Sequence, residues 1–129
     1  MKDLDTRRPP QDLTDHHDKG GLARTLTALT SGDLEAVRGA MHPEARIVGV
    51  QDGVFVSADR ATYLGFRTSL RTAGPLHPET LWVDETGRIA VACIVERTAA
   101  SRTTSYVTLL REAEGWKVIS KTFHDAGSL

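Results

Sequence analysis

The chain has 129 residues, 40% of them hydrophobic and 26% charged, a composition typical of a soluble globular protein with one core. Its formal net charge of −1, with no basic run beyond Arg7-Arg8, argues against a nucleic-acid or anionic-membrane partner. No apolar run approaches the roughly 18 residues that cross a bilayer. The N-terminus also lacks the apolar segment of a secretory signal, so we expect a cytoplasmic protein.

The N-terminal part of the chain carries an arm and a first helical pattern. Residues 1–11 contain several charges and a Pro-Pro pair, so we expect a flexible arm there and a single domain over residues 12–129. A helix is expected over residues 12–30. Its apolar stripe is clearest from Leu22 onward, because Gly20-Gly21 interrupt the pattern before it.

A second helix and two short strands follow. Asp33 is suited to be the N-cap of a short helix that carries Met41 on its inward side. His42-Pro43 is expected to end this helix, because the residue before a proline is pushed out of the helical region. Ala45–Val50 and Val54–Val56 then have strand patterns on either side of a turn.

A third helix is expected over Ala58–Arg71. Ser57 can cap its N-terminus, and Gly74-Pro75 can stop the chain from continuing as a helix. Tyr63 and Phe66 share one face of this helix.

The C-terminal half has the pattern of an antiparallel meander, so that the whole chain is of the α+β class. Its four strands are expected at Pro78–Glu85, Arg88–Thr98, Arg102–Arg111 and Trp116–His124. Ile89–Val95 is apolar at every position, which indicates a strand covered on both faces. The helices would cover one face, and we expect a homodimer to cover the outer face. Cys93, the single cysteine, lies inside this run as an expected core residue and excludes an internal disulfide.

Several short motifs occur in the order and spacing of a known superfamily. They are Ser31-Gly-Asp33, Met41-His-Pro-Glu-Ala45, the strand Tyr106–Leu110 and the strand Gly115–His124. Over about residues 22–124 the chain resembles the NTF2-like superfamily, and within it the putative lumazine-binding, SnoaL-like group. The resemblance implies a cone, in which a curved antiparallel sheet wraps around three helices and leaves a cavity between them.

The last strand is expected to supply most of the cavity wall. Alternation places one set of side chains on one face, namely Trp116, Val118, Ser120, Thr122 and His124. The other face carries Lys117, Ile119, Lys121 and Phe123. Because burial of two lysines in a dry cavity is costly, we expect the first set to face inward as a mostly apolar wall with polar groups.

His124 and Glu96 are the candidates for catalysis by proton transfer. A histidine at a cavity mouth can act as a general acid or base near neutral pH, although His124 could equally be a half-solvated rim residue. Glu96 lies in the long apolar strand and could face the cavity or a dimer interface. A structural ion pair with Arg97 or Arg102 is the alternative role for Glu96.

Other polar and aromatic residues are weaker candidates. Tyr63 and Phe66 on the third helix and Tyr106 on the sheet could contact a ligand, or could be core residues. His42 is expected to shape the bend from helix to strand. His16-His17 are adjacent and point to different sides of a helix, so we expect no metal site.

These observations favour a small-molecule-binding protein that takes a small apolar or amphipathic molecule in its cone, without a cofactor. The alternative is a SnoaL-like or ketosteroid-isomerase-like enzyme, an isomerase, cyclase or dehydratase, that uses histidine and carboxylate acid–base chemistry. A third interpretation is an interaction module with a filled cone.

Overall fold

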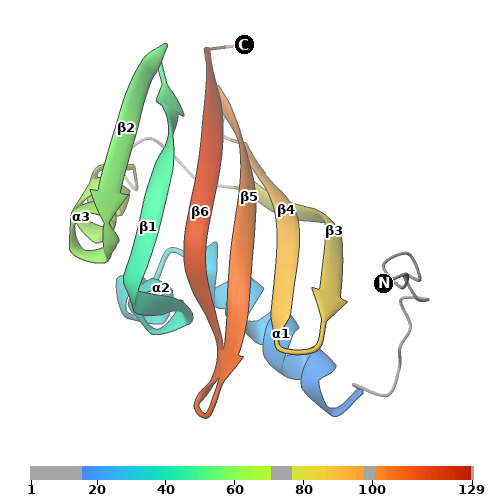
Figure 1. Cartoon of the computed structure of the whole chain (residues 1–129). Helices are drawn as coiled ribbons and strands as arrows, with labels where there is room; N and C mark the ends of the chain where they lie inside the picture. Colours follow the sequence, from blue (N-terminus) through green and yellow to red (C-terminus); the bar gives the residue numbers. More distant parts are fainter. Residues whose placement is uncertain (1–15, 71–76, 98–100, 129) are drawn as a thin grey trace, which may run out of the picture.

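The computed structural model describes residues 16–70, 77–97 and 101–128 (Figure 1). The elements follow one another as α1 (His16–Leu29), α2 (Leu34–Ala40), β1 (Met41–Gln51), β2 (Val54–Asp59), α3 (Arg60–Leu70), β3 (His77–Thr86), β4 (Ile89–Arg97), β5 (Ser101–Glu112) and β6 (Gly115–Ser128). The predicted arm and the predicted stop at Gly74-Pro75 lie outside the described residues. None of the described helices is long and apolar enough to cross a membrane.

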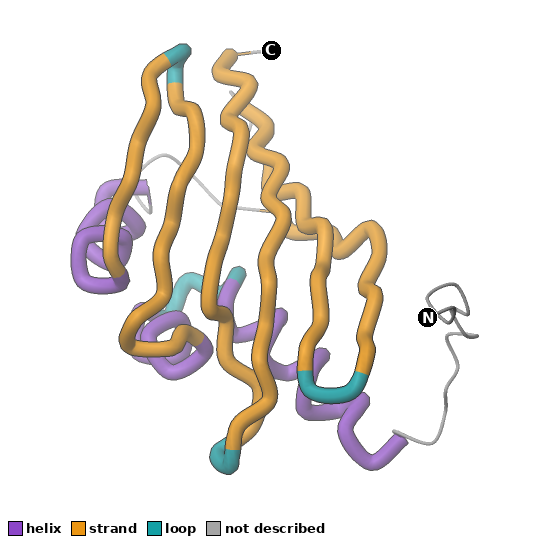
Figure 2. Tube along the Cα trace, viewed as in Figure 1, coloured by secondary structure: helices purple, strands orange, loops and turns teal. Residues whose placement is uncertain are grey.

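The six strands form one curved, open sheet in the order β2-β1-β6-β5-β4-β3. Four of the five strand pairs are antiparallel, as predicted, whereas β1 and β6 are parallel. The parallel pair arises because the chain leaves the β1–β2 hairpin through α3, and the meander β3–β6 then brings its last strand beside β1. The helices lie on one side of this sheet, as Figure 2 shows.

The boundary between α2 and β1 differs from the prediction. Asp33 is the N-cap as expected, and its carboxylate accepts hydrogen bonds from the backbone N–H groups of Glu35 and Ala36. Met41, however, is not helical, because its extended backbone begins β1 four residues earlier than expected. At the bend, the Nδ1 atom of His42 accepts a hydrogen bond from the backbone N–H of Glu44 at 2.9 Å.

The start of α3 also differs from the prediction. Ala58 and Asp59 belong to β2, and the helix begins at Arg60. Asp59 takes the capping role that was expected of Ser57, since its Oδ1 accepts a hydrogen bond from the backbone N–H of Thr62 at 2.9 Å. This hydrogen bond is the main reason that the pKa of Asp59 lies below its usual value.

The hydrophobic core lies between the helices and the concave face of the sheet. Its most completely buried members come from both layers and include Leu29, Val37, Ile47, Ile94, Leu109 and Val118. Trp116 is tied to α1, because the hydroxyl of Thr25 donates a hydrogen bond to its backbone oxygen at 3.1 Å. This hydrogen bond joins α1 to the start of β6.

The outer face of the sheet carries its own apolar row. Trp82 and Tyr106 flank Cys93 in register, and their rings stack with centroids 6.1 Å apart. This arrangement covers Cys93, which is buried as predicted. Trp82 and Tyr106 themselves are about half exposed, at 47% and 53%.

Candidate functional site

A bulge in β6 decides which side chains reach the cavity. Thr108 of β5 pairs with Ser120, but the next residue, Leu109, pairs with Val118, so Ile119 is an extra residue without a partner. Such an insertion shifts the alternation of side chains by one position. Before the bulge, Trp116 and Val118 face inward. After the bulge the inward positions are the odd-numbered ones.

The predicted facing of the last strand is therefore correct for its first half and wrong for its second half. Trp116 and Val118 are buried, but they belong to the core and do not line the pocket. Thr122 and His124 are exposed, and Ser120 lies between them and the bulge on the same outer face. Lys121 and Phe123, which were expected to face outward, point into the cone.

The two predicted catalytic residues, Glu96 and His124, do not lie at the same site. Glu96 is paired in register with Thr103, which is paired in turn with Asp125, whereas His124 is paired with Thr104. The two side chains therefore lie on opposite faces of the sheet, with Glu96 inside and His124 exposed. His124 and Glu96 therefore share no site in this structure at which they could transfer a proton together.

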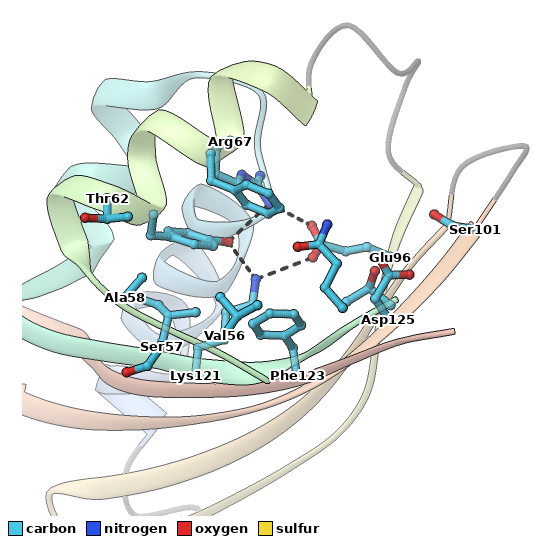
Figure 3. Close-up of a pocket in the computed structure, with 15 residues that line it drawn as sticks. Val56, Ser57, Ala58, Thr62, Arg67, Glu96, Ser101, Lys121, Phe123 and Asp125 are labelled. Atoms are coloured by element: carbon cyan, nitrogen blue, oxygen red, sulfur yellow. Dashed lines mark hydrogen bonds and ion pairs between the residues drawn. The ribbon is translucent and has the colours of Figure 1, made fainter. Parts of the chain in front are cut away.

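A pocket of about 170 Å³ lies between α3 and the concave face of the sheet (Figure 3). Its walls are largely apolar and aromatic, and they are formed by Ile47, Val56, Ala58, Tyr63, Phe66 and Phe123. Neutral polar side chains also line it, namely Gln51, Ser57, Thr62, Ser101 and Thr103. Tyr63 and Phe66 thus lie at the pocket, while Tyr106 lies on the outer face of the sheet.

The buried end of the pocket contains a charged cluster from three separate elements. Tyr63 and Arg67 come from α3, Glu96 from β4 and Lys121 from β6, and each is only 4–6% exposed. Arg67 Nη1 lies 3.3 Å from Glu96 Oε2, and Lys121 Nζ lies 3.6 Å from Glu96 Oε1. A single carboxylate therefore bridges two cations, as the dashed lines in Figure 3 indicate.

The hydroxyl of Tyr63 joins the same two cations. It accepts a hydrogen bond from Lys121 Nζ at 2.6 Å and a longer one from Arg67 Nη1 at 3.4 Å. Arg67 also donates through Nη2 to the backbone oxygen atoms of Leu29 and Ser31, at 3.5 and 3.0 Å. Arg67 thus ties α3 to the end of α1, while Lys121 is held by side chains alone.

The cluster keeps both cations charged at neutral pH. Burial is the largest single influence on the pKa of Lys121 and lowers it, but Tyr63 and Glu96 together outweigh burial and raise the pKa above its usual value. The same balance, between burial on one side and Tyr63 and Glu96 on the other, raises the pKa of Arg67. Two positive charges and one negative charge therefore share a site that is almost closed to water.

Glu96 has the paired arrangement that was one of its predicted roles, but with different partners. It pairs with Arg67 and Lys121 inside the cone, whereas Arg97 pairs with Glu79 at 3.2 Å on the surface. The reason is alternation: Arg97 is adjacent to Glu96 in the strand and so points to the opposite face.

Sequence reasoning missed Arg67, Lys121 and Phe123. Two of these residues had a visible signal. Arg67 follows Tyr63 by four positions, and so shares the helix face that was expected to point inward. Lys121 lies two residues from Ile119 and two residues from Phe123, so its charge falls between two apolar residues at strand spacing.

Known structures place this architecture in the NTF2-like class. An NTF2-like protein of unknown function from Silicibacter pomeroyi DSS-3 superimposes with a TM-score of 0.75 at 19% identity, covering 88% of this chain and 98% of that one. A second, from Shewanella baltica OS155, gives a TM-score of 0.69 at 20% identity, covering 94% and 100%. At these identities the likeness concerns the fold alone.

Sequence comparison identifies the family. Residues 22–124 match the protein family described as "Putative lumazine-binding". The match covers most of the chain, and the protein belongs to this family. No curated protein matches the sequence significantly.

Proposed function

We propose that the protein binds a small, largely apolar molecule in the pocket between α3 and the sheet. The observation that carries the proposal is the composition of the pocket, in which largely apolar and aromatic walls surround the cavity and a cluster of charged groups lies at its buried end. Small-molecule sites commonly combine such walls with a few convergent polar groups. The family description, which names lumazine, also supports a small-molecule ligand.

The size of the cavity limits the ligand. Its volume of about 170 Å³ is close to that of the engineered apolar cavity, about 150 Å³, that admits benzene. The enclosed part of the ligand is therefore one ring or a short chain. Phe66 and Phe123 line the cavity and supply aromatic rings against which such a ligand can pack. The proposal is binding without chemistry, since Glu96 is held by two cations and His124 lies outside the pocket.

A pocket-filling variant tests this proposal. Val56 lines the pocket, and Val54 lies two residues away on the same strand and is 62% exposed. We expect lumazine or small single-ring compounds to give ligand-observed NMR signals with the wild type and with Val54→Trp. These signals should disappear in Val56→Trp, in which an indole fills the cavity. Absence of binding to the wild type, or binding that persists in Val56→Trp, would contradict the proposal.

We further propose that two copies associate through the outer face of the sheet. Trp82 and Tyr106 stack on each other there, and Ile89 lies further along β4; all three apolar side chains are about half exposed in the single chain. Light scattering at micromolar concentration should give twice the chain mass of 14.1 kDa. Tyr106→Arg should give the single-chain mass, and Thr27→Arg, on an exposed position of α1, should not. A wild type that is entirely monomeric would refute the dimer.

A further inference from the structure

The buried end of the pocket carries an excess positive charge. Arg67 and Lys121 are both cationic, and the carboxylate of Glu96 forms an ion pair with each of them. Asp125 also lines the pocket, but it is half-buried, so water screens its charge more effectively. A buried charge without a full complement is costly, and an entering anion would remove that cost.

The two cations of the cluster differ in how many of their hydrogen-bond donors have a partner. The guanidinium of Arg67 is committed to Glu96, Tyr63 and two backbone oxygen atoms. The ammonium of Lys121 makes one short hydrogen bond, to Tyr63, and its contact with Glu96 is 3.6 Å long. An ammonium has three donors, so at least one donor of Lys121 has no hydrogen-bond partner among the described residues.

The hydroxyl group of Tyr63 is in a similar position. Its oxygen accepts from Lys121 and Arg67, which uses both of its lone pairs. Its own hydrogen must then point away from both cations, and it is donated to no group among the described residues. Two adjacent positive charges strengthen this O–H as a donor. Lys121 and Tyr63 thus offer two neighbouring donors in the pocket and call for an acceptor-rich group.

The apolar part of the pocket indicates that the rest of the ligand is apolar. Ile47, Val56, Phe66 and Phe123 give it an apolar wall. A ligand that satisfies both halves has an anionic head and a short apolar body. We propose that the pocket binds a small amphipathic carboxylic acid, whose carboxylate is held by the Lys121 ammonium and the Tyr63 hydroxyl. This assignment rests on the proposed binding function and adds the chemical class of the ligand.

Matched pairs of probes isolate the role of the charge. We would measure the Kd of 3-phenylpropanoate and 3-phenylpropanamide, and of hexanoate and hexanamide, by NMR titration at pH 7. Each pair has the same apolar body, and only the acid carries a charge. We expect each acid to bind at least about tenfold more tightly than its amide, because hydrogen bonds to charged groups are roughly twice as strong as neutral ones.

Two variants assign this preference to the named donors. Lys121→Met removes the ammonium and leaves Arg67 and Glu96 as a balanced pair, so the fold should tolerate it. The acid should then bind no better than the amide, while the Kd of the amide changes little. Tyr63→Phe should reduce the preference in part. Lys117→Met is the control, since Lys117 lies on the same strand but donates to the backbone oxygen of Gly39 and does not line the pocket.

The outcomes separate this inference from the broader proposal. Equal binding of acid and amide to the wild type would overturn the assignment of a carboxylate but leave small-molecule binding in place. An acid preference that survives in both Lys121→Met and Tyr63→Phe would also overturn it. If neither acids nor amides bind, and neutral single-ring compounds do not bind either, both proposals fail.

Discussion

Replacing Glu96 with glutamine should leave two buried cations without their shared carboxylate. The distances of 3.3 and 3.6 Å from Glu96 to Arg67 and Lys121 correspond to gross attractions of about 5 kcal/mol each at an effective dielectric constant of about 20. The loss of stability is smaller than their sum, because Lys121 can release its proton. Deprotonating an ordinary lysine at pH 7 costs about 5 kcal/mol, since its reference pKa is about 10.4.

We therefore expect Glu96→Gln to lower the free energy of unfolding by about 3–5 kcal/mol, as breaking buried ion pairs commonly does. Urea unfolding followed by tryptophan fluorescence measures this change, because Trp116 is buried in the folded protein and becomes exposed to solvent on unfolding. Adding Lys121→Met to Glu96→Gln removes the second buried cation, and should restore at least about 2 kcal/mol of the loss.

The double variant provides the decisive comparison. A simple loss of packing at position 96 would not be repaired by a second substitution at position 121. A change of less than about 1 kcal/mol in Glu96→Gln would refute the reasoning, because it is the size expected for exposed ion pairs. Failure of Lys121→Met to restore stability would refute the charge-based explanation in particular.

Three further predictions concern other parts of the structure. Because the folded-state pKa of Lys121 is raised, its stabilising effect should be complete below the unfolded pKa of about 10.4 and lost as the pH rises through the folded pKa. The free energy of unfolding, measured with urea between pH 8 and 11, should therefore decrease more steeply with pH in the wild type than in Lys121→Met. Equal slopes in the two proteins would contradict this prediction. Gly49→Ala would place a methyl group less than 3.0 Å from the backbone and ring of Phe123, and should cost about 1–3 kcal/mol and alter the pocket, as thermal unfolding and probe binding would reveal. Asp33→Ala removes the N-cap of α2 and should cost about 1 kcal/mol in urea unfolding, whereas Asp33→Asn should cost little.

Local patterns were sufficient for most of the architecture. The strand alternation, the N-cap at Asp33 and the continuous apolar run in β4 each depend on neighbours within a few residues. The order and spacing of the family motifs along residues 22–124 predicted the NTF2-like fold. Errors at the start of α3 and β1 were confined to the few residues where capping and strand formation compete, as at Ser57 and Asp59.

The site depended on long-range information. The bulge at Ile119 is a property of the pairing between β5 and β6. The predicted regular alternation therefore fails after Val118, and Lys121 and His124 lie on the faces opposite to those predicted. Burial of Lys121 was judged too costly from the sequence because its partner Glu96 lies on another strand.

The sequence by itself determined the elements, their class and the apolar character of the core, since these follow from propensities and periodicity along the chain. Only the tertiary structure decided which polar residues share the pocket. Tyr63, Glu96 and Lys121 are far apart in the sequence, and the curved sheet and α3 bring them together. The physical reason is that a buried charge is tolerated only beside its partner, and that proximity is created by strand register and helix packing.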